Sequence, residues 1–257
     1  MKKLLKKILI KFFDPIAGRL GYVKKNNKYF TNKNGLLDIF FSNLKRLGFT
    51  PKHIVDIGAN HGTWTRYTLQ YFPDAKYTLL EPQAWMKDSI QDLLIEKSNI
   101  EFHAVGAGKA AGKFKFTIVN RDDSCSFIYT EEEARERGYK QIEVPVVVLN
   151  EFLSGEAIPD IIKIDAEGLD LEVLEGASDF FGKTEVFMVE AAVVSNKVNN
   201  TIDKVIEFMN RHNYQLFEIT DLNRPFSLGV LWLTELVFIK KNGIIASEVL
   251  QVLDEKL

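Results

Sequence analysis

The stretch VDIGANHGTWT (residues 55–65) decides the fold. An apolar run ends inside it, a turn with glycines at 58 and 62 follows, and a helical pattern then begins. Glycine lets the chain turn tightly and lets a ligand approach the backbone. The pattern indicates the first strand–turn–helix of a nucleoside-binding α/β fold. An ordinary strand-to-helix turn capped by Asp56 is the alternative.

A second acid favours the nucleoside site. Glu81 ends the apolar run YTLLEP (77–82), 19 residues after Gly62 and directly before Pro82. A carboxylate at this position can accept hydrogen bonds from both hydroxyls of a ribose. A surface glutamate at the end of a strand is the alternative, but the paired signals make the nucleoside site the favoured prediction.

The residues of the turn indicate which of two nucleoside cofactors binds. An NAD site uses the triplet G-x-G-x-x-G to make room for a pyrophosphate, and GANHG (58–62) lacks it. Asp56 offers nothing to that anion but can attract the ammonium group of a methionine, directly or through the backbone that it orders. Amides at the helix start favour the methionine carboxylate. We therefore predict S-adenosyl-L-methionine as the cofactor. Its predicted contacts are Asp56, Gly58, Ala59, Asn60, Gly62, Glu81, Pro82, His103 and Ala104.

Short apolar runs alternate with helical patterns from residue 53 onward, which predicts βαβ units and a mostly parallel sheet. We expect a Rossmann-like fold with seven strands, helices on both faces and a C-terminal antiparallel strand pair. The predicted strands are 53–58, 77–82, 100–106, 160–165, 185–191, 214–220 and 235–241. Runs at 113–119 and 144–149 predict either an extension of the sheet edge or a small flap. The predicted helices are 62–71, 84–97, 168–175 and 202–211.

A third motif, DIIKIDAEGLDLEVLEGA (160–177), supplies two further acids. Asp165 stands at the carboxyl end of its strand, where open α/β sheets bind ligands. Glu167 follows in the loop. Asp165 is our first candidate for a catalytic base or substrate anchor, and Glu167 is the second. The alternatives are that Asp165 only pairs with Lys163 and that Glu167 only caps the next helix.

This motif resembles the KxDxEGxExxxLxGA block of the FkbM family of methyltransferases. VDIGANHG (55–62) and LLEP (79–82) are similar to the first two motifs of that family, and DDSCSF (122–127) and VVVLNEFL (146–153) are similar to its serine-rich loop and its "LD" segment. Asp170 replaces a usual glutamate. Asn150 replaces a usual aspartate, so no acidic role is expected at position 150. The resemblance covers roughly residues 50–240.

The resemblance implies O-methylation of a hydroxyl on a sugar, a glycan precursor or a related small molecule. Ser124, Ser126 and Glu190 are the candidates for the substrate side, and His103 fits a core histidine as well as an adenine contact. Two alternatives stay open. One is an NAD-dependent oxidoreductase, and the other is a nucleoside-binding protein without catalysis.

Composition limits the cellular compartment and the classes of binding partner that we expect. The single cysteine, Cys125, allows no disulfide framework, and the four histidines are too scattered for a metal site. A formal net charge of -2 gives no reason to expect nucleic acid as a partner. We expect a cytoplasmic enzyme without a metal, with its catalytic domain at 50–257.

The N-terminal region, residues 1–49, is expected to be helical and begins with a basic amphipathic segment. MKKLLKKILIKFF (1–13) has five lysines, no acid and six large apolar residues at helical spacing. Lysines interrupt its apolar run, which excludes a typical signal peptide. The segment predicts either docking on anionic lipid at the inner face of the membrane or packing on the catalytic domain with the lysines in water.

Overall fold

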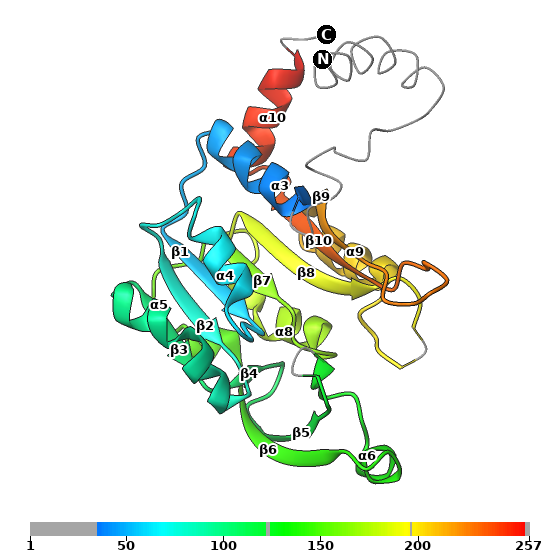
Figure 1. Ribbon diagram of the computed structural model, residues 1–257. Coiled ribbons are helices and arrows are strands. Elements are labelled where there is room, and N and C mark those ends of the chain that lie inside the picture. Colours follow the sequence, from blue (N-terminus) through cyan, green and yellow to red (C-terminus); the bar gives the residue numbers. More distant parts are fainter. Residues whose placement is uncertain (1–34, 122–123, 196, 255–257) are drawn as a thin grey trace, which may run out of the picture.

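The structure is a computed structural model that describes residues 35–121, 124–195 and 197–254 (Figure 1). The basic segment 1–13, for which an amphipathic helix is predicted, lies outside the described residues. Within the described part of the chain, no helix combines the length and the apolar character that crossing a membrane requires.

A seven-stranded sheet forms the centre of the molecule, in the order β3-β2-β1-β7-β8-β10-β9. Neighbouring strands are parallel except that β10 is antiparallel to both β8 and β9. The predicted mostly parallel sheet with a C-terminal antiparallel pair is therefore confirmed. The strands are β1 His53–Ile57, β2 Lys76–Leu80, β3 Ile100–His103, β7 Ile161–Ile164, β8 Val186–Ala192, β9 Tyr214–Asn223 and β10 Leu233–Lys240.

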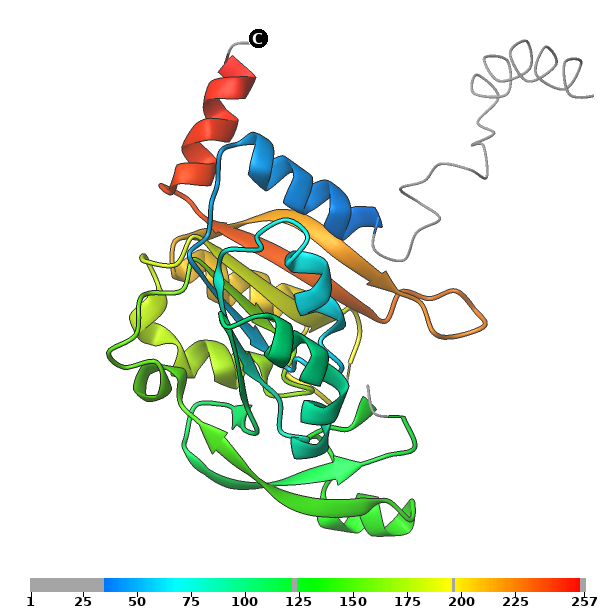
Figure 2. The ribbon, with the colours of Figure 1, turned by 60° about the vertical axis from the view of Figure 1, so that its left-hand side comes forward.

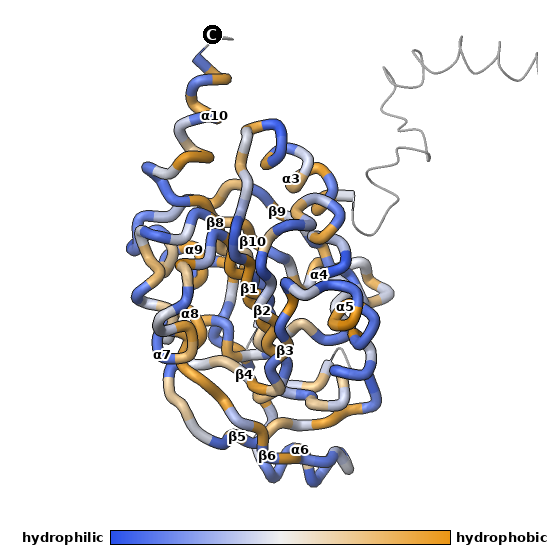
Figure 3. The backbone as a smooth tube through the Cα atoms, turned by 90° about the vertical axis from the view of Figure 1, so that its left-hand side faces the viewer, coloured by the Kyte–Doolittle hydropathy of each residue, from blue (hydrophilic) through white to orange (hydrophobic). Residues whose placement is uncertain are grey.

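Helices cover both faces of this sheet, as predicted. One face carries α3 (Gly35–Arg46), α4 (Thr63–Thr68), the 3-10 turn η1 (Ala84–Ile90) with α5 (Gln91–Glu96), and α10 (Ile244–Asp254). The other face carries α7 (Leu149–Phe152), α8 (Asp170–Gly176), the turn η3 (Ser178–Phe180) and α9 (Ile202–Arg211). Parallel strands buried on both faces read as continuous apolar runs, which is why the sequence locates them well. Figure 3 shows the hydrophobic segments gathered in the strands between the two layers.

Three expected elements differ in detail. The predicted helix 84–97 begins as a 3-10 turn before it becomes α5, and the predicted helix 168–175 begins at Asp170 and ends at Gly176. The predicted strand 100–106 ends at His103 because the chain turns there, with the Val105 amide donating to the His103 carbonyl.

After this turn the chain enters a separate three-stranded sheet in the order β4-β6-β5. Its strands are β4 (Gly106–Ala107), β5 (Gly112–Ile118) and β6 (Lys140–Val147), and α6 (Glu131–Glu136) precedes β6. Of the two interpretations of runs 113–119 and 144–149, the flap is confirmed. This flap lies at one end of the molecule, opposite α3 and α10 (Figures 1 and 2).

Helix α3 belongs to the core of the catalytic domain, although the sequence placed it in a separate N-terminal region. Phe40 and Phe41 are fully buried in the same core cluster as the strand residues of β1, β2 and β8. The ring of Phe41 lies 5.8 Å from that of Trp64 in α4 and 5.8 Å from that of Phe72. The part of residues 1–49 that the structure describes is thus continuous with the domain that follows.

Candidate functional site

The candidate site lies where β2, β1, β7 and β8 end. The Gly58 amide donates to the Leu80 carbonyl, and the Asp165 amide donates to the Ile57 carbonyl. The loops after these strands therefore leave the sheet side by side. The carboxyl edge of a parallel sheet is where such folds bind ligands.

A buried lysine holds this edge together. Lys163 of β7 is 4 % exposed, and its Nζ lies 3.3 Å from Asp56 Oδ1 and 3.3 Å from Asp165 Oδ2. The same Nζ donates to the carbonyl oxygens of Ile57 and Gly58. Burial lowers the pKa of Lys163, but the charges of Asp165 and Asp56 more than offset this and raise it above its usual value. Lys163 is therefore a cation that joins two strands and one turn.

Asp56 faces the protein interior. It is fully buried, and its Oδ2 accepts a 2.6 Å hydrogen bond from the Thr65 hydroxyl of α4. Its other oxygen is the one beside Lys163. Of the two routes by which Asp56 was expected to serve an ammonium group, full burial removes direct contact and leaves ordering of the turn.

The turn amides bond within the protein. Gly58 and Ala59 donate to the Leu80 carbonyl, Asn60 donates to Glu81, and Gly62 donates to the Ala59 carbonyl. The N-cap of α4, Gly62, supplies no side-chain hydrogen bond, so the first amides of the helix keep their capacity to donate to a ligand.

Glycine is required at positions 58 and 62 for reasons of packing. Both have left-handed backbones, with φ of 72° and 69°. A Cβ at Gly58 would lie 1.8 Å from the Asp165 carbonyl oxygen, and one at Gly62 would lie 2.7 Å from Ile90. The missing Cβ at Gly62 thus makes room for η1, and approach of a ligand to this backbone stays a prediction. The missing Cβ at Gly58 lets the Asp165 carbonyl lie against the turn.

Glu81 connects the turn to the end of β2. It is buried, and its two oxygens accept 2.8 Å hydrogen bonds from the amides of Asn60 and Gln83. Burial raises its pKa, while these amides act in the opposite direction. A carboxylate has about four acceptor sites. The Gln83 side chain also bonds this carboxylate, and contact of Glu81 with the ribose hydroxyls stays a prediction.

The remaining predicted cofactor contacts follow the same edge. Pro82 continues from Glu81 and is partly buried, and the His103 carbonyl accepts from the Glu81 amide. The imidazole of His103 packs edge-on against Phe152 of α7, with ring centroids 5.0 Å apart. Ala104 follows directly and is partly exposed. His103 is thus partly exposed beside Glu81 and is not a core histidine.

Three acids predicted for catalysis and substrate binding interact with one another. Burial, then the charges of Asp165 and Asp170, raise the pKa of Glu167 well above its usual value. Burial, then Asp165 and Glu167, raise the pKa of Glu190 in the same way. Asp165 is the acid among them that has a cation, Lys163, at 3.3 Å. Glu167 and Glu190 are therefore protonated more readily than an ordinary glutamate, and a protonated carboxyl group can donate a hydrogen bond.

Asp170 shapes the loop that carries Asp165 and Glu167. Its fully buried carboxylate accepts from the amides of Ala166 and Gly168 and from the side-chain amide of Asn200. Glu167 itself has a left-handed backbone, with φ of 50°. Asp170, the first residue of α8, thus orders the loop before the helix, and the N-cap residue Leu169 makes no side-chain cap hydrogen bond. Burial raises the pKa of Asp170 to about 7 although the loop amides lower it.

The serine-rich segment lies against this loop. The Phe127 amide donates to the Glu167 carbonyl, so Ser126 is next to a residue in direct contact with the site. Ser126 is buried, and its Oγ has no hydrogen-bond partner among the described residues. Ser124 donates its amide to the Arg121 carbonyl and is partly buried. Asn150 lies elsewhere, where it bonds Ser178 and Asp179 and connects α7 to η3.

A cavity of about 220 Å³ opens beside Asp165, on the sheet face that α3 and α4 cover. Glu190 of β8 and Glu235 of β10 stand directly opposite each other in the antiparallel register. Thr220 donates a short hydrogen bond to Glu235, and burial raises the pKa of Glu235 to about 7. The apolar wall comes from Leu37, Trp64 and Tyr67.

Sequence analysis did not single out Glu235 or Thr220. The signal for Glu235 is its position in LTELVFIK (233–240), where it interrupts a face continued by Val237 and Ile239. An acid on the buried face of an apolar strand is costly unless it is paired or functional.

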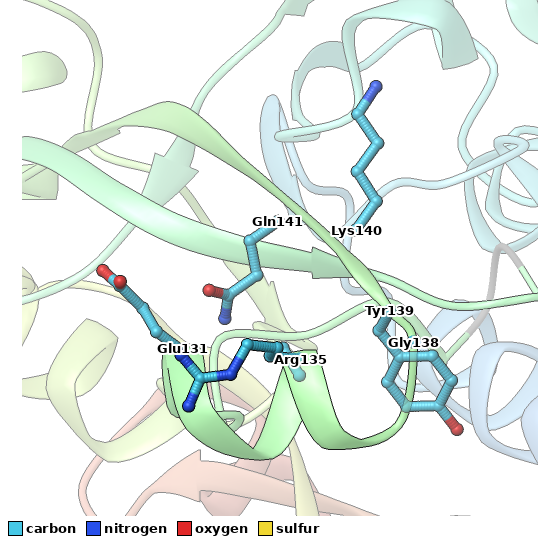
Figure 4. A pocket seen from close by; sticks show the side chains of 7 residues that line it. Glu131, Arg135, Gly138, Tyr139, Lys140 and Gln141 are labelled. Atoms are coloured by element: carbon cyan, nitrogen blue, oxygen red, sulfur yellow. The ribbon is translucent and has the colours of Figure 1, made fainter.

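A larger open hollow of about 550 Å³ lies beside α6 (Figure 4). Glu131, Arg135, Tyr139 and Gln141 line it, and none of the predicted site residues does. The side chains that Figure 4 labels are those of a solvated helix and the start of β6. The buried acids and the cavity beside Asp165 therefore define the candidate site.

The strand order and the strand–turn–helix with an acid at the end of β2 define a Rossmann-like methyltransferase domain. The model of the methyltransferase FkbM domain matches residues 56–216, which is more than half of the chain. The chain therefore belongs to the FkbM methyltransferase family. Its cofactor is S-adenosylmethionine, which excludes the alternative of an NAD-dependent oxidoreductase.

Individual proteins resemble parts of the chain. "Methyltransferase 1" from Beauveria bassiana is 25% identical over 147 residues, which cover 49% of this chain and 58% of that protein. The crystal structure of a methyltransferase FkbM from Methylobacillus flagellatus is similar with a TM-score of 0.48 and 19% identity, covering 73% of this chain and 43% of that one. A precorrin-6y C5,15-methyltransferase from Geobacter metallireducens has a TM-score of 0.46 and 14% identity, covering 79% and 87%. The chain thus spans about half of the length of the first two proteins.

Replacing Lys163 by methionine should destabilise the protein by about 3–5 kcal/mol, because Asp56 would stay buried without a cation. Urea unfolding followed by circular dichroism measures this. Adding Asp56→Asn removes the uncompensated charge and keeps an acceptor for Thr65, so the double variant should regain much of the loss. Lys109→Met, on an exposed ion pair, is the control. A Lys163→Met protein as stable as wild type would show that the ion pair is dispensable.

Replacing Glu81 by alanine should weaken binding of S-adenosylhomocysteine by about 1.5–3 kcal/mol, because ribose hydroxyls would lose a charged acceptor. Calorimetry measures the loss. A 2′-deoxyribose analogue separates this role from ordering of the turn, since wild type should bind it more weakly than the parent while Glu81→Ala should not discriminate. Glu101→Ala, on the next strand, is the control. Equal binding by Glu81→Ala and wild type would contradict the assignment.

Proposed function

We propose that the protein transfers a methyl group from S-adenosylmethionine to a hydroxyl oxygen of a sugar, a glycan precursor or a related small molecule. The observation that carries the proposal is the position of Asp165, which lies between the buried cation Lys163 and the cavity. The bound cofactor supplies an electrophilic methyl group, so the protein must bind, orient and deprotonate the acceptor hydroxyl.

Asp165 is suited to receive that proton. Lys163 lies at Oδ2, and the side chain is about one third exposed toward the cavity, which leaves Oδ1 for a ligand. A carboxylate held by one oxygen keeps a fixed direction at the other. The proton of the acceptor hydroxyl would pass to Oδ1 of Asp165 as the oxygen becomes nucleophilic.

Glu167 and Glu190 have a complementary role. Burial and the neighbouring acids raise their pKa values, so these two acids take up a proton more readily than an ordinary glutamate. In that form they can donate to acceptor oxygens while Asp165 accepts. A vicinal diol of a sugar presents both donors and acceptors and matches such a mixed set. Carboxyl groups on one side and the side chains of Trp64 and Tyr67 on the other suit the polar rim and apolar ring face of a sugar.

The site has more acidic residues than binding of the cofactor requires. This favours a catalytic protein over one that only binds a nucleoside. A non-catalytic domain gains nothing from placing Asp165, Glu167 and Glu190 together beyond the predicted cofactor contacts, where each is partly buried and loses hydration. One assay distinguishes catalysis from nucleoside binding alone. It measures transfer of a labelled methyl group from S-adenosylmethionine to nucleotide sugars and lipid-linked glycans, which only a catalytic protein performs.

Asp165→Asn should lower turnover by about 10²–10⁴-fold, which is the usual loss when a general base is removed. Affinity for S-adenosylhomocysteine should change little, because Asp165 serves the acceptor side. Initial rates of labelled-methyl transfer on the acceptor found by the screen provide the measurement. Glu175→Gln, an exposed acid of α8, is the matched control. Near-normal turnover would reduce Asp165 to a structural partner of Lys163.

We also propose that residues 1–13 dock on anionic lipid and hold the enzyme near membrane-linked glycans. Each basic residue near such a surface contributes roughly 1 kcal/mol, and the apolar side chains add burial. Replacing Lys2, Lys3, Lys6 and Lys7 by glutamine should release the protein from vesicles containing phosphatidylserine at low salt, as measured by co-sedimentation. Lys45→Gln and Lys52→Gln are control substitutions of surface lysines elsewhere. Unchanged pelleting would favour packing of the segment on the catalytic domain.

A further inference from the structure

The hairpin that joins β9 and β10 ends in an apolar tip, residues 222–232, which projects beyond the sheet (Figures 1 and 2). Leu228 is 87% exposed and Val230 is 53% exposed. Val194, beside the base of the tip, is 77% exposed. The other large apolar side chains exposed there are Leu222, Phe226 and Trp232. Contiguous exposed apolar side chains mark a protein or membrane contact.

Hydrogen bonds and ring packing within the tip fix its conformation. Arg224 donates a 2.7 Å hydrogen bond to the Gly229 carbonyl across the turn, and the Gly229 amide donates to the Phe226 carbonyl. The rings of Phe226 and Trp232 pack with centroids 5.5 Å apart. At the base, the Val193 amide donates to the Trp232 carbonyl and connects the tip to the chain after β8. The apolar side chains are therefore held outward by a defined scaffold.

The charge and size of the tip indicate which partner fits. The segment LNRPFSLGVLW (222–232) has one arginine and no acid, so an anionic surface would repel no carboxylate within it. Its apolar residues include Trp232 and Phe226, aromatic side chains that suit the boundary between water and lipid. A stable contact between two copies needs roughly 20–30 residues on each side, far more than this narrow tip offers.

We propose that residues 222–232 insert into the surface of an anionic bilayer, as a membrane contact distinct from the N-terminal segment. Thr220 and Asp221, on the same strand just before the tip, line the cavity beside Asp165. A tip seated among lipid headgroups therefore brings the mouth of the cavity to the membrane surface. The contact does not depend on which acceptor the enzyme methylates.

The experiment uses the full chain and vesicles of phosphatidylcholine with phosphatidylserine. Leu228→Ser/Val230→Ser removes two side chains that are exposed and can be changed without disturbing the brace at Arg224. Their burial in lipid should make the variant bind at least about tenfold more weakly. The matched control is Ile95→Ser/Ile158→Ser, which removes two exposed apolar side chains elsewhere and should bind like wild type. Equal vesicle affinity of the tip variant and wild type overturns the proposal.

Two further measurements distinguish insertion into lipid from pairing between two copies of the chain. Lipids brominated on their acyl chains should quench the fluorescence of the bound wild type, and Trp232→Phe should lose most of that quenching. Absence of quenching overturns insertion. Light scattering tests the competing occupant, because a wild-type dimer that Leu228→Ser/Val230→Ser converts to a monomer would identify the tip as an interface between copies and also overturn the proposal.

Discussion

The ion pair between Lys163 and Asp56 is the interaction on which the site depends. It joins β1 and β7 where the register sets these two residues opposite each other, and its cation reaches on to Asp165 and to the carbonyl of Gly58. Burying charges is costly, and a buried ion pair is often no more stabilising than apolar packing. Its value here lies in geometry, since one cation fixes the glycine turn and the direction of the acid nearest the cavity.

A second buried acid, Asp170, fixes the conformation of the loop after β7. Asp170 holds the amides of Ala166 and Gly168 and is itself held by Asn200, whose side-chain amide also reaches the Glu190 carbonyl. The flap closes the loop from the other side, through the hydrogen bond from Phe127 to Glu167. Asp170 at the start of α8, Asn200 and the flap thus together position the acids proposed for the acceptor side. Displacement of any one of them would be transmitted to the others.

The sequence predicted the sheet and the edge at which the acids meet, because buried parallel strands leave unbroken apolar runs and their carboxyl ends share one edge. It could not predict which way each acid faces. Asp56 was expected beside a cofactor, but its position on the inward face of β1 places it against Lys163 and Thr65. Glu235 was missed because its function depends on Glu190, which lies 45 residues away in sequence and becomes its neighbour only through antiparallel pairing.

The charge of the cavity limits how an acceptor can lie. Lys163 is already shared between Asp56 and Asp165, whereas Glu190 and Glu235 stand opposite each other on the neighbouring strands β8 and β10. A phosphate placed here would meet repulsion from Asp165 at short range with little screening, and Glu190 and Glu235 would add to that repulsion whenever they are ionised. If the acceptor is a sugar attached to a phosphate, the sugar must therefore enter while the phosphate stays at the mouth. Arg224 lies in the hairpin tip that follows Thr220 and Asp221 at this mouth, so the tip supplies one cation on that side of the cavity.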